Sequence, residues 1–154
     1  MASCILMRKT LAATDNEICW PDGIALCPWR EEHAQSAHAL LQQAGQLATT
    51  LTVTDWLKQL PQDPEFDPHL CHLACDVHGL AGIAVGWTST FIRHLAVSPR
   101  ARGQGLGVAL LHSLFATYRQ RGEGYVDLKV AIDNHPARRL YASTGMIEVR
   151  RYTQ

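Results

Sequence analysis

Alternation of apolar and polar positions predicts a strand over residues 125–131. There Val126, Leu128 and Val130 alternate with Asp127 and Lys129, which is the period of a half-buried strand. Five other segments, bounded by Gly, Pro or Ser-Thr turns, also have strand character. They are Ile24–Leu26, Leu70–Val77, Ala81–Thr88, Phe91–Val97 and Met146–Tyr152.

Helical spacing of apolar residues predicts four helices between these strands. The clearest stripe lies in residues 106–121 and is one-sided over four turns. Start and stop residues delimit the others. Pro28 opens a helix that ends at Gly45, Thr54 and Asp55 cap one around Trp56 that ends at Pro61, and Asn134 caps one that ends at Gly145.

This order of elements predicts an α/β (α+β) fold. Strands on both sides of the helical segments require a mixed central sheet of six to seven strands with helices on both faces. The 154 residues are enough for one domain, 1–154, with a core that needs no disulfide or metal. Residues 1–22 are poorly patterned and are predicted to be either an extra strand or an arm.

A glycine-rich loop follows the fourth of these strands. Residues 100–107 read Arg-Ala-Arg-Gly-Gln-Gly-Leu-Gly, directly before the long helix. Glycines let a ligand approach the backbone, and the first amides of a helix attract negative charge, so the loop predicts a phosphate-bearing ligand. Val108 excludes the dinucleotide fingerprint, and the absence of Gly-Lys-Ser/Thr excludes a Walker loop. A tight structural turn is the alternative.

A second block lies near the end of the chain. Asn134, Ala137, Leu140, Tyr141 and Gly145 occur in that order, and Met146 follows. Together with the stretch 92–107, where Arg102, Gly105 and Gly107 are spaced as Arg-x-x-Gly-x-Gly, this block resembles the GNAT superfamily of N-acetyltransferases. The resemblance covers residues 92–154; before that only the order of elements agrees.

The resemblance implies a largely antiparallel sheet in which two central parallel strands, Phe91–Val97 and Tyr125–Ala131, splay apart around the pantetheine of acetyl-CoA. It implies a β-bulge near Arg93 and His94, which parity also requires if Ile92, Leu95 and Val97 are all core residues. The implied acetyl-CoA-binding residues are Leu95, Ala96, Val97, Arg102, Gly103, Gln104, Gly105, Leu106, Gly107, Asn134, Ala137 and Arg139. Asn134 also fits a plain helix cap, and Arg138 and Arg139 also fit solvated surface charges.

Two residues are the candidates for acid–base chemistry. Acetyl transfer to an amine requires a neutral amine and a proton for the departing thiolate, and a phenol near pKa 10 can supply that proton. The resemblance places Tyr141 in that role. His94 is the candidate base because histidine titrates nearest neutral pH. Relatives often have a carboxylate near this position, where the chain has Arg93 and His94.

The predicted function is therefore transfer of an acetyl group from acetyl-CoA to a primary amine by direct attack in a ternary complex. The alternative is a non-catalytic acyl-CoA-binding sensor or interaction module. Neither a nucleic-acid motif nor a membrane span is present in the sequence, so neither partner is expected. We expect a cytoplasmic location, and a homodimer is left open.

Charge is divided unequally along the chain. Residues 1–90 contain four Lys/Arg and ten Asp/Glu, and residues 91–154 contain ten Lys/Arg and four Asp/Glu. An acidic substrate side would favour a cationic amine. Solvated surface charges are the equally weighted alternative.

The remaining reactive residues are interpreted as structural. His69, Cys71, His72, Cys75 and His78 invite a metal site, but alternation puts the two cysteines on one face as core residues. The opposite face has His72, Ala74, Asp76 and His78, and the histidines and Asp76 are expected to face solvent or the cleft. No metal is expected. The five cysteines are expected to be free thiols of a reducing compartment. Trp20, Trp29, Trp56 and Trp87 are assigned mainly to core packing, with an aromatic pocket as the alternative.

Overall fold

The computed structural model describes residues 3–12 and 17–153. Within these ranges the strands form a seven-stranded sheet in the order β2-β3-β4-β5-β6-β1-β7. All neighbours are antiparallel except β5 and β6, which are parallel. The mixed, largely antiparallel sheet is confirmed. The strands are β1 Ser3–Thr10, β2 Ala25–Cys27, β3 Phe66–Asp76, β4 Gly79–Trp87, β5 Phe91–Val97, β6 Tyr125–Ala131 and β7 Ile147–Thr153.

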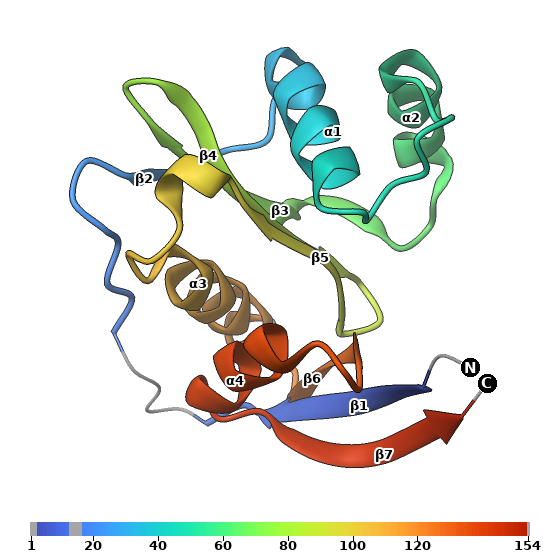
Figure 1. The fold of residues 1–154 in the computed structure, drawn as a ribbon, viewed down its shortest axis with the longest axis vertical. Coiled ribbons are helices and arrows are strands. Elements are labelled where there is room, and N and C mark those ends of the chain that lie inside the picture. Colours follow the sequence, from blue (N-terminus) through green and yellow to red (C-terminus); the bar gives the residue numbers. More distant parts are fainter. Residues whose placement is uncertain (1–2, 13–16, 154) are drawn as a thin grey trace.

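Helices cover both faces of this sheet (Figure 1). Helices α1 (Ala34–Gln43) and α2 (Val53–Gln59) lie on one face, and α3 (Leu106–Gln120) and α4 (His135–Ser143) lie on the other. Each face has its own apolar core: Leu41, Trp56 and Ile83 belong to the first, and Leu110 and Phe115 belong to the second. Among the described residues, no helix is both long and apolar enough to cross a bilayer.

The first residues of the chain form a central strand. β1 lies between β6 and β7 and pairs with both, and Ile5 and Met7 point into the core beside α3. The alternative of an extra strand is therefore confirmed for Ser3–Thr10, while residues 1–2 and 13–16 of the predicted arm lie outside the described residues. Because both partners of β1 come from the far end of the chain, no local pattern marks its position.

The first predicted helix begins later than expected. Pro28 does not open it: Arg30 has extended backbone angles, a 3₁₀ turn covers Glu31–His33, and α1 starts at Ala34. The extended segment lets the Trp29 ring pack edge-on against Trp56 at 5.9 Å. The cap of α2 is also shifted, because the Thr52 hydroxyl accepts the hydrogen bond from the Asp55 amide.

His72 does not face solvent or a cleft, so this prediction was wrong for His72. Its side chain is buried, and His72 Nδ1 lies 2.6 Å from the hydroxyl of Ser113 on α3. Burial lowers the pKa of His72, which keeps the ring neutral. Alternation could not reveal this because helices cover both faces of β3, and neither face is the wet one.

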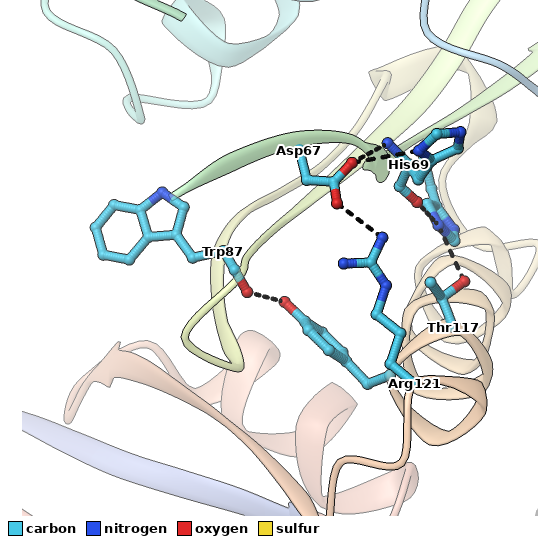
Figure 2. Close-up of polar contacts among 7 residues, drawn as sticks. Asp67, His69, Trp87, Thr117 and Arg121 are labelled. Atoms are coloured by element: carbon cyan, nitrogen blue, oxygen red, sulfur yellow. Dashed lines mark hydrogen bonds and ion pairs between the residues drawn. The ribbon is translucent and has the colours of Figure 1, made fainter. Parts of the chain in front are cut away.

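Opposite charges from the two halves of the chain pair with one another. Figure 2 shows Asp67 between His69 and Arg121, and the Asp67 carboxylate accepts a 2.8 Å hydrogen bond from the Arg121 guanidinium. Asp76 pairs with Arg100 in the same way. Burial alone would raise the pKa of Asp67, but hydrogen bonds from the His69 amide and Arg121 lower it overall. Two acidic residues of β3, Asp67 and Asp76, therefore pair with arginines from the basic second half of the chain.

Candidate functional site

The site begins where β5 and β6 separate. The two strands pair where Phe91 lies opposite Asp127, with the Asp127 amide donating to the Thr90 carbonyl at 2.9 Å. Beyond this point they diverge, which confirms the predicted splay (Figure 1). The backbone groups of β5 that would bond to β6 in a regular sheet face the gap instead.

A β-bulge sets the direction of β5 at this gap. Val85 pairs with His94 and Gly86 pairs with Ile92, so Arg93 is the extra residue. The predicted bulge is confirmed. It turns Ile92 and Leu95 toward α3 on one side, while His94 and Ala96 are buried on the side of α1 and α2.

The glycine-rich loop ends in an open helix terminus. Gly103 and Gly105 have φ values of 79° and 85°, which side chains disfavour, and Gly105 is the N-terminal cap of α3. No side chain of the described residues caps this terminus. The first amides of α3 are therefore available to an anion, with the helix dipole favouring its charge. Arg102 is exposed beside them, and its Nε donates to the Val97 carbonyl at 3.4 Å.

A cleft of about 630 Å³ joins the loop to the separated strands. It contains most of the predicted acetyl-CoA-binding residues: Leu95, Ala96, Val97, Arg102, Gly103, Gly105, Leu106, Gly107, Asn134 and Ala137, together with Tyr141. Gln104 is exposed between two lining glycines. Arg139 is not brought to the cleft: it lines a separate cavity with Ile5 and Met7.

Gln46, which the sequence did not single out, reaches the edge of β5. Its Nε2 donates to the Leu95 carbonyl at 2.7 Å, and its Oε1 accepts from the Leu95 amide at 3.2 Å. The side-chain amide thus bonds to Leu95 as a neighbouring strand would. No local sequence signal could have found Gln46, because it lies in the turn after α1, 49 positions from its partner.

The same carboxamide orients His94. Because the two bonds to Leu95 fix which atom of Gln46 is oxygen, His94 Nδ1 must donate to Oε1, at 3.2 Å. The neutral ring then has its lone pair on Nε2. Burial, assisted by the charge of Arg93, lowers the pKa of His94 to about 4. His94 is thus a neutral hydrogen-bond acceptor at pH 7 rather than a group that titrates there.

Tyr141 and Asn134 lie where the cleft meets the strand gap. Both line the cleft and a neighbouring cavity of about 530 Å³ between β5 and β6. Burial raises the pKa of the Tyr141 phenol, so it stays protonated at neutral pH. The Asn134 Oδ1 accepts from the Ala137 amide at 3.3 Å, so it is the N-terminal cap of α4 as well as a lining residue.

A third cavity lies on the side of α1 and α2. It has a volume of about 470 Å³ and includes Trp29, Trp56, Phe66 and Trp87 among its lining residues, with His94 and Arg93 at the boundary to the strand gap. The alternative of an aromatic pocket therefore holds for three of the four tryptophans, whereas Trp20 packs against the core on the α3 side. Among residues 3–12 and 17–153, no three His, Cys, Asp or Glu side chains cluster as a metal site would require.

The comparisons with known proteins agree with this geometry. The chain is 35% identical over 75 residues to a putative [ribosomal protein bS18]-alanine N-acetyltransferase of Bacillus subtilis, covering 49% of this chain and 47% of the relative. It is 34% identical to a mycothiol acetyltransferase of Beutenbergia cavernae over 80% of this chain and 44% of the relative. The chain thus spans about half the length of the curated relatives it matches.

Fold and family follow from two further matches. The structure of a GCN5-related N-acetyltransferase from Sphaerobacter thermophilus matches with a TM-score of 0.84 and 27% identity, covering 98% of this chain and 50% of that one. The model of the acetyltransferase (GNAT) family matches residues 26–146, well over half of the chain. This chain therefore belongs to the GNAT acetyltransferase family.

Proposed function

We propose that this chain transfers an acetyl group from acetyl-CoA to a primary amine by direct attack. The observation that carries the proposal is the convergence of two features on one cleft. Among the described residues, the edge of β5 at Leu95 has no strand partner and bonds only to the Gln46 side chain, so it can bond to a ligand's amide and carbonyl groups once Gln46 is displaced, and the uncapped start of α3 can bind phosphate. A pantetheine with a pyrophosphate at one end requires this combination. The acetyltransferase names of the relatives support the activity.

Acetyl-CoA would lie with its pyrophosphate at the amides of residues 103–108 and its pantetheine along Leu95 and Val97. Strand alternation points the amides of both residues toward the same edge of β5. The Leu95 amide would then donate to the thioester carbonyl, whose oxygen gains charge during attack. Gln46 Oε1 accepts this same hydrogen, so Gln46 must leave Leu95 when the cofactor arrives.

In the reaction, the nitrogen of the neutral amine bonds to the acetyl carbon, the carbon–sulfur bond breaks, and the nitrogen loses one proton. An ammonium group must lose another proton before the attack. For an amine of pKa about 10.4, deprotonation at pH 7 costs about 5 kcal/mol. Nε2 of His94 would accept a hydrogen bond from the amine and pass its proton to water, because a base with a pKa of about 4 does not retain it. The Tyr141 phenol would protonate the departing thiolate and regain its proton from water, so that the proton lost by the amine is balanced by the one on the CoA thiol.

Calorimetric titration of acetyl-CoA tests the cofactor site. Wild type should bind with micromolar affinity, and a variant with Arg102→Glu and Gly105→Glu should lose binding at least 100-fold, because both changes place negative charge at the start of α3. Circular dichroism checks that the variant is folded. A folded wild-type protein that does not bind acetyl-CoA would contradict the proposal.

The low pKa of His94 also favours a second candidate, a sensor that binds acyl-CoA without turnover. The two candidates differ in thiol release. Release of CoA that depends on an added amine supports the enzyme, whereas tight binding without release over a broad amine panel supports the sensor.

A further inference from the structure

Aromatic side chains dominate the lining of the cavity beside α2. Four aromatic residues line it, Trp29, Trp56, Phe66 and Trp87, together with aliphatic Leu47, Leu51, Leu60 and Val85. Its volume of about 470 Å³ is within the range of small-molecule sites, which are mostly apolar with a few polar groups.

The rings are held in place by one another. Trp29 is edge-on to Trp56 at 5.9 Å and to Phe66 at 6.4 Å. Trp87 is the last residue of β4, and the Arg93 guanidinium of the neighbouring strand β5 lies 5.7 Å from the centre of its ring. Rings fixed in this way present flat apolar surfaces without further loss of side-chain freedom, which favours a flat or bulky apolar group.

The charges at the cavity do not suit a polycation. Asp63 and Arg93 are the acidic and basic lining residues and balance each other. One Asp63 oxygen already accepts the Glu65 amide at 2.9 Å. Asp67 and Asp76, which contribute to the acidic first half, are paired with arginines elsewhere. The lining residues therefore have no net negative charge that would bind a second ammonium group.

The inner end of the cavity meets the reaction centre. His94 and Arg93 line both the aromatic cavity and the gap between β5 and β6, and that gap also includes Leu95 and Tyr141. A molecule whose apolar group lay among the tryptophans would therefore have its other end at His94, next to the exposed edge of β5.

We propose that this cavity is the acceptor site, and that its substrate is a primary amine attached to an aromatic or bulky aliphatic group. The inference rests on the proposed acetyl transfer and names the substrate class for it. The apolar group lies between Trp29, Trp56 and Trp87, and the amine lies at His94.

A series of amino-acid amides tests this class. Glycinamide, alaninamide, leucinamide and phenylalaninamide share the amine and differ in the apolar group, and spermidine serves as the polycation. With saturating acetyl-CoA, kcat/KM for thiol release should be about 100-fold higher for phenylalaninamide than for alaninamide, and leucinamide should fall between them. Equal values along the series, or a preference for spermidine, would overturn the proposal.

Two variants locate the effect. Trp29→Ala should lower kcat/KM for phenylalaninamide about 20-fold relative to kcat/KM for glycinamide. Trp20→Ala removes a tryptophan that is also half-buried but lies outside the cavity, and it should change neither value. Leu51→Trp fills the cavity and should lower kcat/KM for phenylalaninamide more than kcat/KM for glycinamide. A loss that is equal for both amides in the two cavity variants would contradict the assignment.

Direct binding separates this proposal from the proposed function. Calorimetry on the same samples measures acetyl-CoA and phenylalaninamide independently. Phenylalaninamide binding that weakens at least fivefold in Trp29→Ala supports the cavity even where acetyl-CoA does not bind, a result that would contradict only the acetyl transfer. Acetyl-CoA binding without any Trp29-dependent binding of phenylalaninamide would overturn the acceptor site alone.

Discussion

The cleft on the α3 side of β5 is built mainly from backbone, whereas the cavity on the α1 and α2 side is built from side chains. The cleft uses the edge of β5 at Leu95 and Val97, which lacks a strand partner in the described part of the chain, and the amides at the start of α3, from one stretch of sequence. The cavity takes its rings from Trp29, Trp56 and Trp87, which come from distant segments. A cofactor that is common to a family can be bound by backbone groups, whose geometry does not depend on the identity of the side chains. Selectivity for one acceptor requires particular side chains.

The largest expected effect concerns His94, which lies between the two sites. Its pKa is about 4 in the folded protein against about 6.5 in the unfolded chain. The unfolded chain therefore binds a proton first as the pH falls, so this contribution to stability is complete above pH 6.5 and is lost toward pH 4. Between these values wild type should lose about 3 kcal/mol of unfolding free energy through His94.

Urea unfolding of wild type and His94→Gln at pH 7 and pH 4 measures this. The variant should lack that part of the pH dependence, because glutamine does not titrate. Equal pH dependence in the two proteins would show that burial does not lower the pKa of His94 in the folded protein.

The next effect concerns turnover on the cleft side. Tyr141→Phe should lower kcat about 100-fold because the thiolate departs without a proton donor. The acetyl-CoA dissociation constant should not change, since the ring remains in place. Tyr125→Phe, which removes a hydroxyl from an exposed tyrosine on β6, is the control. If Tyr141→Phe kept the wild-type kcat, Tyr141 would not be the proton donor, and the residues of the cleft would only bind the cofactor.

A smaller difference should separate Arg102 from Arg139, two arginines that were both among the predicted acetyl-CoA-binding residues. Arg102 is exposed at the cleft, so Arg102→Gln should weaken acetyl-CoA binding about 10-fold through loss of a phosphate contact. Arg139 lines the separate cavity beside Ile5 and Met7, so Arg139→Gln should not change the affinity for acetyl-CoA. Calorimetry at fixed salt compares the two. Equal losses would mean that the cofactor also reaches the far side of α4.

The smallest effect has the opposite sign. Gln46→Ala should tighten acetyl-CoA binding about fivefold, because the cofactor no longer displaces a side chain from Leu95. Gln43→Ala, on the exposed face at the end of α1, is the control. Weaker binding in Gln46→Ala would instead show that Gln46 remains beside the bound cofactor and contacts it.

Much of the cleft could be predicted because its signals are local. The bounds of β5 and β6 agree residue for residue with the predicted strands, and parity indicated a bulge near Arg93 and His94 once Ile92, Leu95 and Val97 were taken as core residues. Glycines that adopt positive φ before an apolar stripe marked the start of α3. Such features depend on neighbours in the chain, so the sequence contains them directly.

The aromatic cavity and the contacts of His94 could not be predicted in the same way. Tryptophans favour burial wherever they occur, and only packing separates those that line a cavity from Trp20 in the core. Likewise, alternation placed His72 on a face of β3 but could not tell that α3 covers that face.

The sequence by itself therefore determined the order of the elements from β2 onward, the family resemblance and the glycine-rich loop, because these depend on periodicity, on short motifs and on glycine. Only the tertiary structure decided that β1 enters the sheet between β6 and β7, that Gln46 bonds to Leu95, and that three tryptophans surround one cavity. These contacts join residues far apart in the chain, and their free energy comes from burial and hydrogen bonds that exist only once the sheet has formed.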